Sequence, residues 1–209
     1  MAEQLRVIDH PLIHHNLTIL RDAATPPAEF RRRLRHICQL MLPEVTADLP
    51  TRETTVQTPL EPAAARQIGA RIVVVSILRA GLGMQDALID LLPEAVSGHL
   101  GFYRNEKTLQ PVQYYVNLPR DLHESYVILC DPMLATGGSL HAALTLLKRG
   151  GARNLRCLTL VAAPEGVKCL REGHPDVPVF TAVLDRQLNE RGYILPGLGD
   201  AGDRQFGTL

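Results

Sequence analysis

The chain has 209 residues, of which 45% are hydrophobic and 21% charged, and its 22 basic residues are balanced by 22 acidic ones. This composition is typical of a globular protein, and the length predicts a single domain, residues 1–209, with a substantial core. Because the net charge is zero, bulk electrostatics give no reason to expect nucleic acid or an acidic membrane as a partner. The apolar runs are too short to span a bilayer, the four cysteines lack disulfide or zinc spacing, and no signal peptide is predicted. We therefore expect a cytoplasmic protein.

The N-terminal region is predicted to be helical. Residues 26–49 form the clearest helix of this region, because Phe30, Leu34 and Ile37 recur at spacings of three or four. Pro43 is expected to kink or split this helix. The arginines at its centre are interpreted as a solvated face rather than as a phosphate-binding patch.

From residue 71 onward, apolar strands alternate with helices. Strands are predicted over 72–78, 95–103, 113–118, 126–131, 155–163 and 177–184, and helices over 81–92, 140–148 and 165–172. Strands that are apolar throughout and separated by helices indicate an α/β fold with a mainly parallel central sheet and helices on both faces. Such a sheet binds ligands at the carboxyl ends of its strands, where Arg79 and Asp131 fall.

The C-terminal stretch 193–204 is rich in glycine and proline and is predicted to form no regular helix or strand. Its apolar residues and its acids, Asp200 and Asp203, favour an ordered segment. Gly197, Gly199 and Gly202 match the spacing of a dinucleotide-binding fingerprint. We reject that interpretation because no helix is expected to follow and no chain remains for a ribose-binding acid.

Residues 127–139, Val-Ile-Leu-Cys-Asp-Pro-Met-Leu-Ala-Thr-Gly-Gly-Ser, are the most informative segment. An apolar strand leads into Asp131, and a short loop then ends in Thr136-Gly-Gly-Ser139 at the start of a predicted helix. Backbone N–H groups of glycines at a helix N-terminus favour an anion, and a carboxylate just upstream accepts hydrogen bonds from sugar hydroxyls. The pattern points to a ribose phosphate. On this pattern alone, an ordinary strand–turn–helix corner stays an alternative.

The string from Asp131 to Ser139 resembles the phosphoribosyl pyrophosphate (PRPP) loop of type I phosphoribosyltransferases, in the form found in the uracil phosphoribosyltransferase family. Pro132 stands where most type I members have a second acid, a feature that the uracil branch shares. Three further segments resemble the same family in the same order: the pyrophosphate loop at 76–83, the flexible flap at 101–119 and the uracil-binding hood at 192–208. The resemblance covers nearly the whole chain.

This resemblance implies the type I phosphoribosyltransferase fold, with a core at 70–185, a flap hairpin, and an irregular hood made by 186–209 together with N-terminal elements. It implies a pentosyltransferase that converts uracil and PRPP to UMP and pyrophosphate in pyrimidine salvage, with Mg²⁺ as cofactor. It also implies a homodimer or larger homo-oligomer. Activation by GTP occurs in only some relatives and stays open. The pyrophosphate loop is expected to hold a non-proline cis peptide near 78–81.

Residue roles follow from the same resemblance. Asp131, Arg104 and Arg79 are the predicted catalytic residues. Uracil is expected to contact Ile194, Gly199, Asp200 and Ala201, largely through backbone groups, and Asp200 to reach the metal through water. The predicted PRPP-binding residues are Arg79, Arg104, Asp131, Pro132, Met133, Leu134, Ala135, Thr136, Gly137, Gly138, Ser139 and Asp200.

The competing hypothesis is a non-catalytic regulator on the same fold, one that senses nucleotides or binds RNA. Zero net charge and a complete hood segment argue against it. A nucleotide-dependent oxidoreductase is a more distant alternative, because Asp86 also occupies the third glycine position of a fingerprint that would begin at Gly81.

Overall fold

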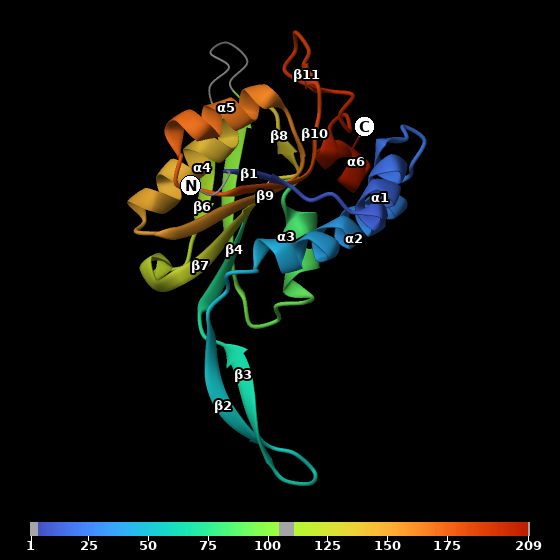
Figure 1. Cartoon of the computed structure of the whole chain (residues 1–209). Coiled ribbons are helices and arrows are strands. Elements are labelled where there is room, and N and C mark those ends of the chain that lie inside the picture. The colour runs from blue at the N-terminus through green and yellow to red at the C-terminus, as the bar shows by residue number, and fades with distance from the viewer. Residues whose placement is uncertain (1–3, 105–110, 209) are drawn as a thin grey trace.

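A computed structural model describes residues 4–104 and 111–208, apart from the side chains of Arg104 and Pro111. In this part of the chain, eight strands form one sheet in the order β1-β10-β9-β7-β4-β5-β6, with β8 beside β9 (Figure 1). Neighbouring strands are parallel except β5 and β6, which are antiparallel. The strands are β1 (Leu5–Val7), β4 (Arg71–Leu78), β5 (Val96–Arg104), β6 (Pro111–Asn117), β7 (Ser125–Cys130), β8 (Met133–Leu134), β9 (Asn154–Ala162) and β10 (Val179–Leu184).

Helices cover both faces of this sheet, as predicted, and two buried apolar clusters fill the two interfaces. One cluster joins the sheet to α1 (Pro11–Arg21), α2 (Pro27–Val45), α3 (Leu82–Ile89) and α6 (Ala201–Phe206). The other joins it to α4 (Gly138–Arg149) and α5 (Pro164–Gly173), with the short 3₁₀ helix η1 (Leu122–Glu124) beside them. The central strands β4 and β7 are buried on both sides, which is why their sequences are apolar without alternation.

The predicted mainly parallel α/β fold is confirmed, but three local expectations are wrong. Pro43 does not split α2, because it lies in the last turn and the helix ends at Val45. The stretch 193–204 is not wholly irregular: β12 (Ile194–Leu195) pairs with β11 (Gln187–Leu188), and α6 begins at Ala201. A helix therefore does follow the three glycines, although it has only six residues.

Strand β1 was not predicted. It is a three-residue edge strand that runs parallel to β10, and two of its three residues are exposed. This strand forms because it pairs with residues 174 positions away, and no local apolar pattern marks it. In the described part of the chain, no helix is long and apolar enough to cross a membrane.

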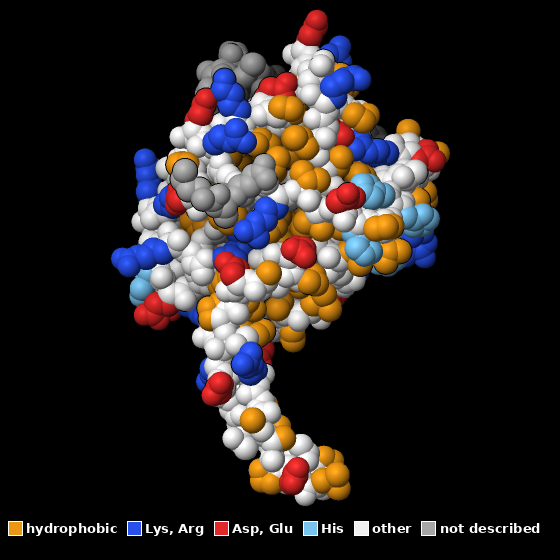
Figure 2. Space-filling view, viewed as in Figure 1, with side chains coloured by type: hydrophobic (Ala, Val, Ile, Leu, Met, Phe, Trp, Pro, Cys, Tyr) orange, Lys and Arg blue, Asp and Glu red, His pale blue; other side chains and the backbone are white. Residues whose placement is uncertain are grey.

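An antiparallel hairpin of β2 (Thr51–Gln57) and β3 (Pro62–Ile68) projects from the body (Figures 1 and 2). We call residues 51–68 the arm. Its side chains are mostly exposed on both faces. Leu60, at the tip, has 94% of its surface exposed.

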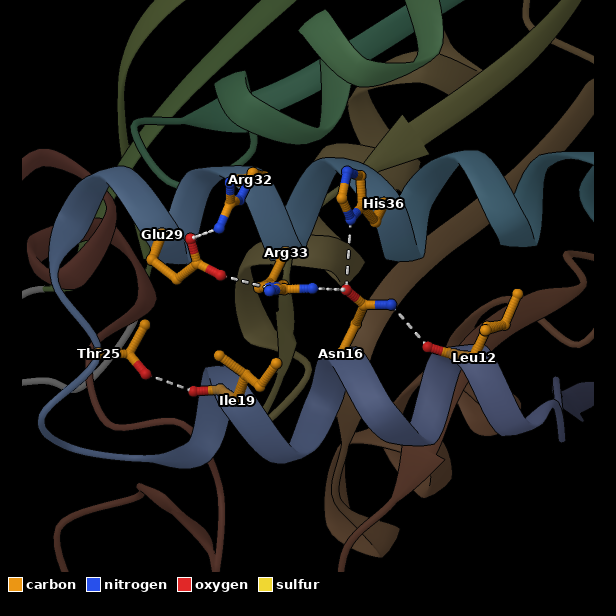
Figure 3. Close-up of polar contacts among 8 residues, drawn as sticks. All are labelled: Leu12, Asn16, Ile19, Thr25, Glu29, Arg32, Arg33 and His36. Atoms are coloured by element: carbon orange, nitrogen blue, oxygen red, sulfur yellow. Dashed lines mark hydrogen bonds and ion pairs between the residues drawn. The ribbon is translucent and has the colours of Figure 1, made fainter.

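Helices α1 and α2 are joined by a polar network centred on Asn16, which is buried (Figure 3). Its side-chain nitrogen donates to the Leu12 carbonyl oxygen at 2.7 Å, and its oxygen accepts from Arg33 at 3.2 Å. Glu29 in turn pairs with Arg32 and Arg33. Within the arginine cluster of α2, Arg33 therefore joins α2 to α1, whereas Arg32 stays on the solvated face.

Candidate active site

The predicted pyrophosphate and PRPP loops meet at one edge of the sheet. Ser76 of β4 lies opposite Cys130 of β7 in a parallel register, so the loops that follow the two strands leave side by side. Strand β5 is the next neighbour of β4 and ends at Arg104. The backbone of Arg104 thus lies at the same edge. Its side chain and the flap residues 105–110 are outside the described residues.

Backbone hydrogen bonds attach the first residues of the PRPP loop to β9 and to the residue that follows it. The Pro132 carbonyl oxygen accepts from the N–H groups of Leu160 and Val161, both at 3.1 Å, and the Ala163 N–H donates to the Leu134 carbonyl oxygen at 2.9 Å. These bonds fix residues 132–134, and the last residues of the loop then turn into α4. They do so through Gly137, whose φ of 84° is in the left-handed region that glycine adopts without strain. A side chain there would also meet Cys169 of α5.

Asp131 stands directly after β7, half-buried. Its N–H donates to the Leu158 carbonyl oxygen at 3.2 Å, and its Oδ1 accepts from the Met133 N–H at 3.2 Å. Burial raises the pKa of the Asp131 carboxyl to about 7; the Met133 hydrogen bond lowers this pKa and the negative charge of Asp200 raises it. A nearby cation, or ligand hydroxyls that donate hydrogen bonds to this carboxyl, would favour its ionised form.

Arg79 is the first residue of the pyrophosphate loop after the end of β4. The Leu78–Arg79 peptide bond is cis, so the predicted non-proline cis peptide is confirmed. Its guanidinium donates to Oδ1 of Asp203 at 3.2 Å and lies 5.7 Å from the centre of the Phe206 ring. Both partners belong to α6. Asp203 was not among the predicted site residues, because nothing in the local sequence links it to a residue 124 positions away.

The hood segment lies at the same edge of the sheet, where Asp203 pairs with Arg79. The side chains of Ile194 and Ala201 are buried, whereas Gly199 and Asp200 are exposed. Gly199 has a φ of 73°. Asp200 is the N-cap of α6, and its Oδ1 accepts from the Asp203 N–H at 2.9 Å.

Helix α6 packs directly on the pyrophosphate loop. A Cβ on Gly202 would lie 3.7 Å from the Cβ of Ala80, and one on Gly83 would lie 2.5 Å from the side chain of Gln205. The structure thus brings the PRPP loop, the pyrophosphate loop and the hood together at one site. Among the described residues, no cluster of three or more His, Cys, Asp or Glu could hold a metal ion. Asp131 and Asp200, whose charges influence each other, are the carboxylates that fit a Mg²⁺ ion here, because this ion commonly takes one or two carboxylates together with substrate phosphates.

The chain matches the family model "Uracil phosphoribosyltransferase" over residues 7–208. It belongs to the uracil phosphoribosyltransferase family. Relatives of that name include the proteins of Halalkalibacterium halodurans, 53% identical, and Symbiobacterium thermophilum, 54% identical, each over 203 residues that make up 97% of both chains. The relative from Streptococcus pyogenes is 53% identical over 204 residues, 97% of this chain and 98% of its own.

Solved structures agree with the predicted fold. The AQ2163 protein from Aquifex aeolicus superposes with a TM-score of 0.92 at 36% identity, over 97% of each chain. An adenine phosphoribosyl transferase from Trypanosoma brucei gives a TM-score of 0.61 over 90% of this chain and 87% of its own. At 14% identity, that second likeness shows the shared fold alone.

Proposed function

We propose that the chain catalyses the transfer of a phosphoribosyl group from PRPP to uracil, giving UMP and pyrophosphate. The observation that supports this most directly is the convergence of Asp131, Arg79 and the hood at the carboxyl edge of the sheet. The family to which the chain belongs favours this enzyme over a non-catalytic regulator.

In this proposal the loop 132–139 binds the 5′-phosphate. The amides around Gly137 and the N-terminus of α4 supply donors and a favourable dipole for that anion. Asp131 accepts hydrogen bonds from the ribose hydroxyls. Arg79 and Arg104 bind the pyrophosphate, because an arginine fork matches the geometry of phosphate oxygens.

The chemistry relies on positioning and electrostatics. As the bond from C1 to pyrophosphate lengthens, negative charge grows on the leaving group and positive charge on the ribose. The guanidinium groups of Arg79 and Arg104 stabilise the first, and the Asp131 carboxylate stabilises the second. A Mg²⁺ ion bound with PRPP would supply further positive charge to stabilise the departing pyrophosphate, and Asp200 is the residue that would help to hold it, through water. Uracil N1 then bonds to C1 and releases its proton to solvent.

The base is read by the hood backbone in this proposal. Uracil presents carbonyl acceptors on both sides of an N–H donor, and the N–H and C=O groups around Ile194, Gly199 and Ala201 can match that pattern. Asp200 stands where the base site meets the PRPP site. Cytosine lacks the second carbonyl acceptor, so it would leave buried polar groups unpaired and be rejected.

Incubation of the protein with PRPP, Mg²⁺ and one nucleobase at a time tests this function. We expect UMP and pyrophosphate to form from uracil, no nucleotide to form from cytosine or the purines, and the yield to vanish when Mg²⁺ is chelated. Product from a purine, or no UMP from uracil, would overturn the proposal. A parallel incubation with GTP tests whether that nucleotide activates the enzyme.

A homo-oligomer is also part of the proposal, and the arm supports it. Leu60 is 94% exposed at the tip of a projecting hairpin, so its side chain packs on little of its own chain. Covering an exposed leucine contributes on the order of 2 kcal/mol, and a second copy of the chain can provide that cover.

The proposed location is the cytoplasm. All four cysteines carry free thiols, which suits that reducing compartment.

Leu60→Asp should shift the protein toward monomer, because it puts a charge where the arm would contact its partner. Light scattering coupled to size exclusion measures the mass. Glu61→Gln at the same tip serves as the control and should leave the mass unchanged. A Leu60→Asp protein with the mass of the parent oligomer would contradict the role of the arm.

A further inference from the structure

The hood turn is fixed at Gly197 by an ion pair from elsewhere in the chain. The Gly197 N–H donates to Oδ2 of Asp185 at 2.9 Å, and its carbonyl oxygen accepts from Nη1 of Arg21 at 3.0 Å. Both polar groups of one backbone residue are thus bound by Arg21 and Asp185, which lie 176 and 12 positions away.

The two side chains also bind each other through two hydrogen bonds. Nη2 of Arg21 donates to Oδ1 of Asp185 at 2.6 Å, and Nη1 donates to Oδ2 at 2.9 Å. The Asp185 side chain is 4% exposed and that of Arg21 is 23% exposed. A planar guanidinium and a carboxylate paired in this way have a defined relative orientation, which lysine cannot reproduce.

Each partner is itself held by a rigid element. Asp185 follows β10, and its N–H donates to the Ala162 carbonyl oxygen at 2.8 Å. Arg21 is the last residue of α1, where the helix dipole favours a positive charge. The Asn16 network fastens α1 to α2 (Figure 3). Arg204 of α6 donates to the carbonyl oxygens of Leu20 and Asp22 on either side of Arg21.

Gly197 occupies the sharp turn that joins the two parts of the proposed base site. Its φ is 62°, and a Cβ there would overlap the Ile194 carbonyl oxygen. Ile194 lies before this turn, and Gly199, Asp200 and Ala201 lie after it. Any shift of Gly197 therefore changes the position of one group of base contacts relative to the other.

We infer that Arg21 and Asp185 are positioning residues that set uracil affinity and selectivity by holding the hood turn at Gly197. This inference rests on the proposed function. Stability alone is a poor reason for a buried ion pair, because apolar residues of similar size stabilise a fold at least as well. Orientation is what the pair supplies: backbone donors and acceptors discriminate between bases only when they are fixed where the base presents its partners.

The test measures steady-state kinetics of Arg21→Lys and Asp185→Asn with uracil and with PRPP as the varied substrate. We expect the uracil KM to rise roughly 10- to 100-fold in each variant, because the guanidinium–carboxylate pair that fixes the hydrogen bonds to Gly197 is disrupted. The PRPP KM should stay within about twofold of the parent, since the PRPP loop is untouched. Because Arg21 and Asp185 act as one unit, the double variant should resemble either single variant rather than multiply their effects.

Base selectivity gives a second measurement. The ratio of kcat/KM for uracil to that for cytosine should fall in both variants. Arg71→Lys is the matched control, because Arg71 pairs with Asp121 at 3.0 Å on the exposed, opposite end of the sheet. That control should have parent values of KM and selectivity.

Three outcomes are decisive. A uracil KM and a selectivity equal to those of the parent would overturn the inference, and so would equal increases of both KM values, which indicate general loosening. Binding of PRPP without uracil, measured by calorimetry, shows whether each variant is folded; the conservative Arg21→Lys change keeps the test valid if Asp185→Asn unfolds. A parent protein that makes no UMP contradicts the proposed function itself, which is a separate result.

Discussion

Asp131→Asn should lower turnover by roughly a hundredfold or more while leaving the fold intact. The side chain keeps its shape, and its oxygen still accepts from the Met133 N–H. What is lost is the negative charge that we place beside the ribose at the moment when positive charge develops there. Steady-state kinetics with uracil and PRPP measure the loss. Asp121→Asn, on an exposed carboxylate at the other end of the sheet, should have parent turnover.

The same substitution should stabilise the ligand-free protein. Burial raises the pKa of Asp131 from 3.8 to about 7, so between these values the folded state binds more protons than the unfolded state, and stability falls as the pH rises. Asparagine removes this cost, and we expect a gain of about 2 kcal/mol at about pH 8, or roughly 4–8 °C in Tm, and a smaller gain at about pH 5. A variant with parent turnover, or one whose Tm gain does not depend on pH, would contradict the role of this carboxyl.

Gly81→Ala should disrupt the pyrophosphate loop. A Cβ at residue 81 would lie 2.6 Å from the Cys130 carbonyl oxygen and 2.7 Å from that of Ile77, and backbone atoms cannot move aside as a flexible side chain would. Gly81 has an ordinary φ of −67°, so the clash arises from the missing space and not from backbone strain. The loop must therefore separate from the end of β7.

We expect this separation to cost about 3 kcal/mol, or roughly 10 °C in Tm. The remaining folded enzyme should be roughly a hundredfold less active, because the position of Arg79 relative to Asp131 changes. Thermal melts and kinetics at a temperature where the variant is folded separate the two effects. Gly69→Ala at the base of the arm is the control: its nearest backbone contacts would be 3.2–3.3 Å, so it should change stability less and activity little. Parent activity in Gly81→Ala would show that the two loops need not touch.

The strength of the local motifs explains what could be predicted. Strand β7, Asp131 and the turn into α4 follow one another along the chain, so their order already places a carboxyl beside an anion-binding turn. Apolar strands without alternation likewise require cover on both faces. Asp185 offered the same local signal as Asp131, a carboxylate directly after a predicted buried strand, and that signal could have marked it as a site residue.

Short elements were missed where distant contacts create them. Helix α6 has six residues and two glycine neighbours, Gly199 and Gly207, so its own propensity is weak; packing on the pyrophosphate loop and the buried Arg204 hold it in place. Strand β1 exists because β10 offers an open edge. The arm lacks an apolar face, so no periodic pattern marked it.

The order of residues along the chain was thus enough to define the α/β class and the family, and to mark the residues that we propose to contact the sugar phosphate, because each of those signals lies within a short, continuous segment. Tertiary folding alone paired Arg79 with Asp203 and brought Arg21 and Asp185 to Gly197. The physical reason is that an ion pair depends on the distance between two side chains in space. Residues more than a hundred positions apart acquire that distance only when the sheet and its helices have formed.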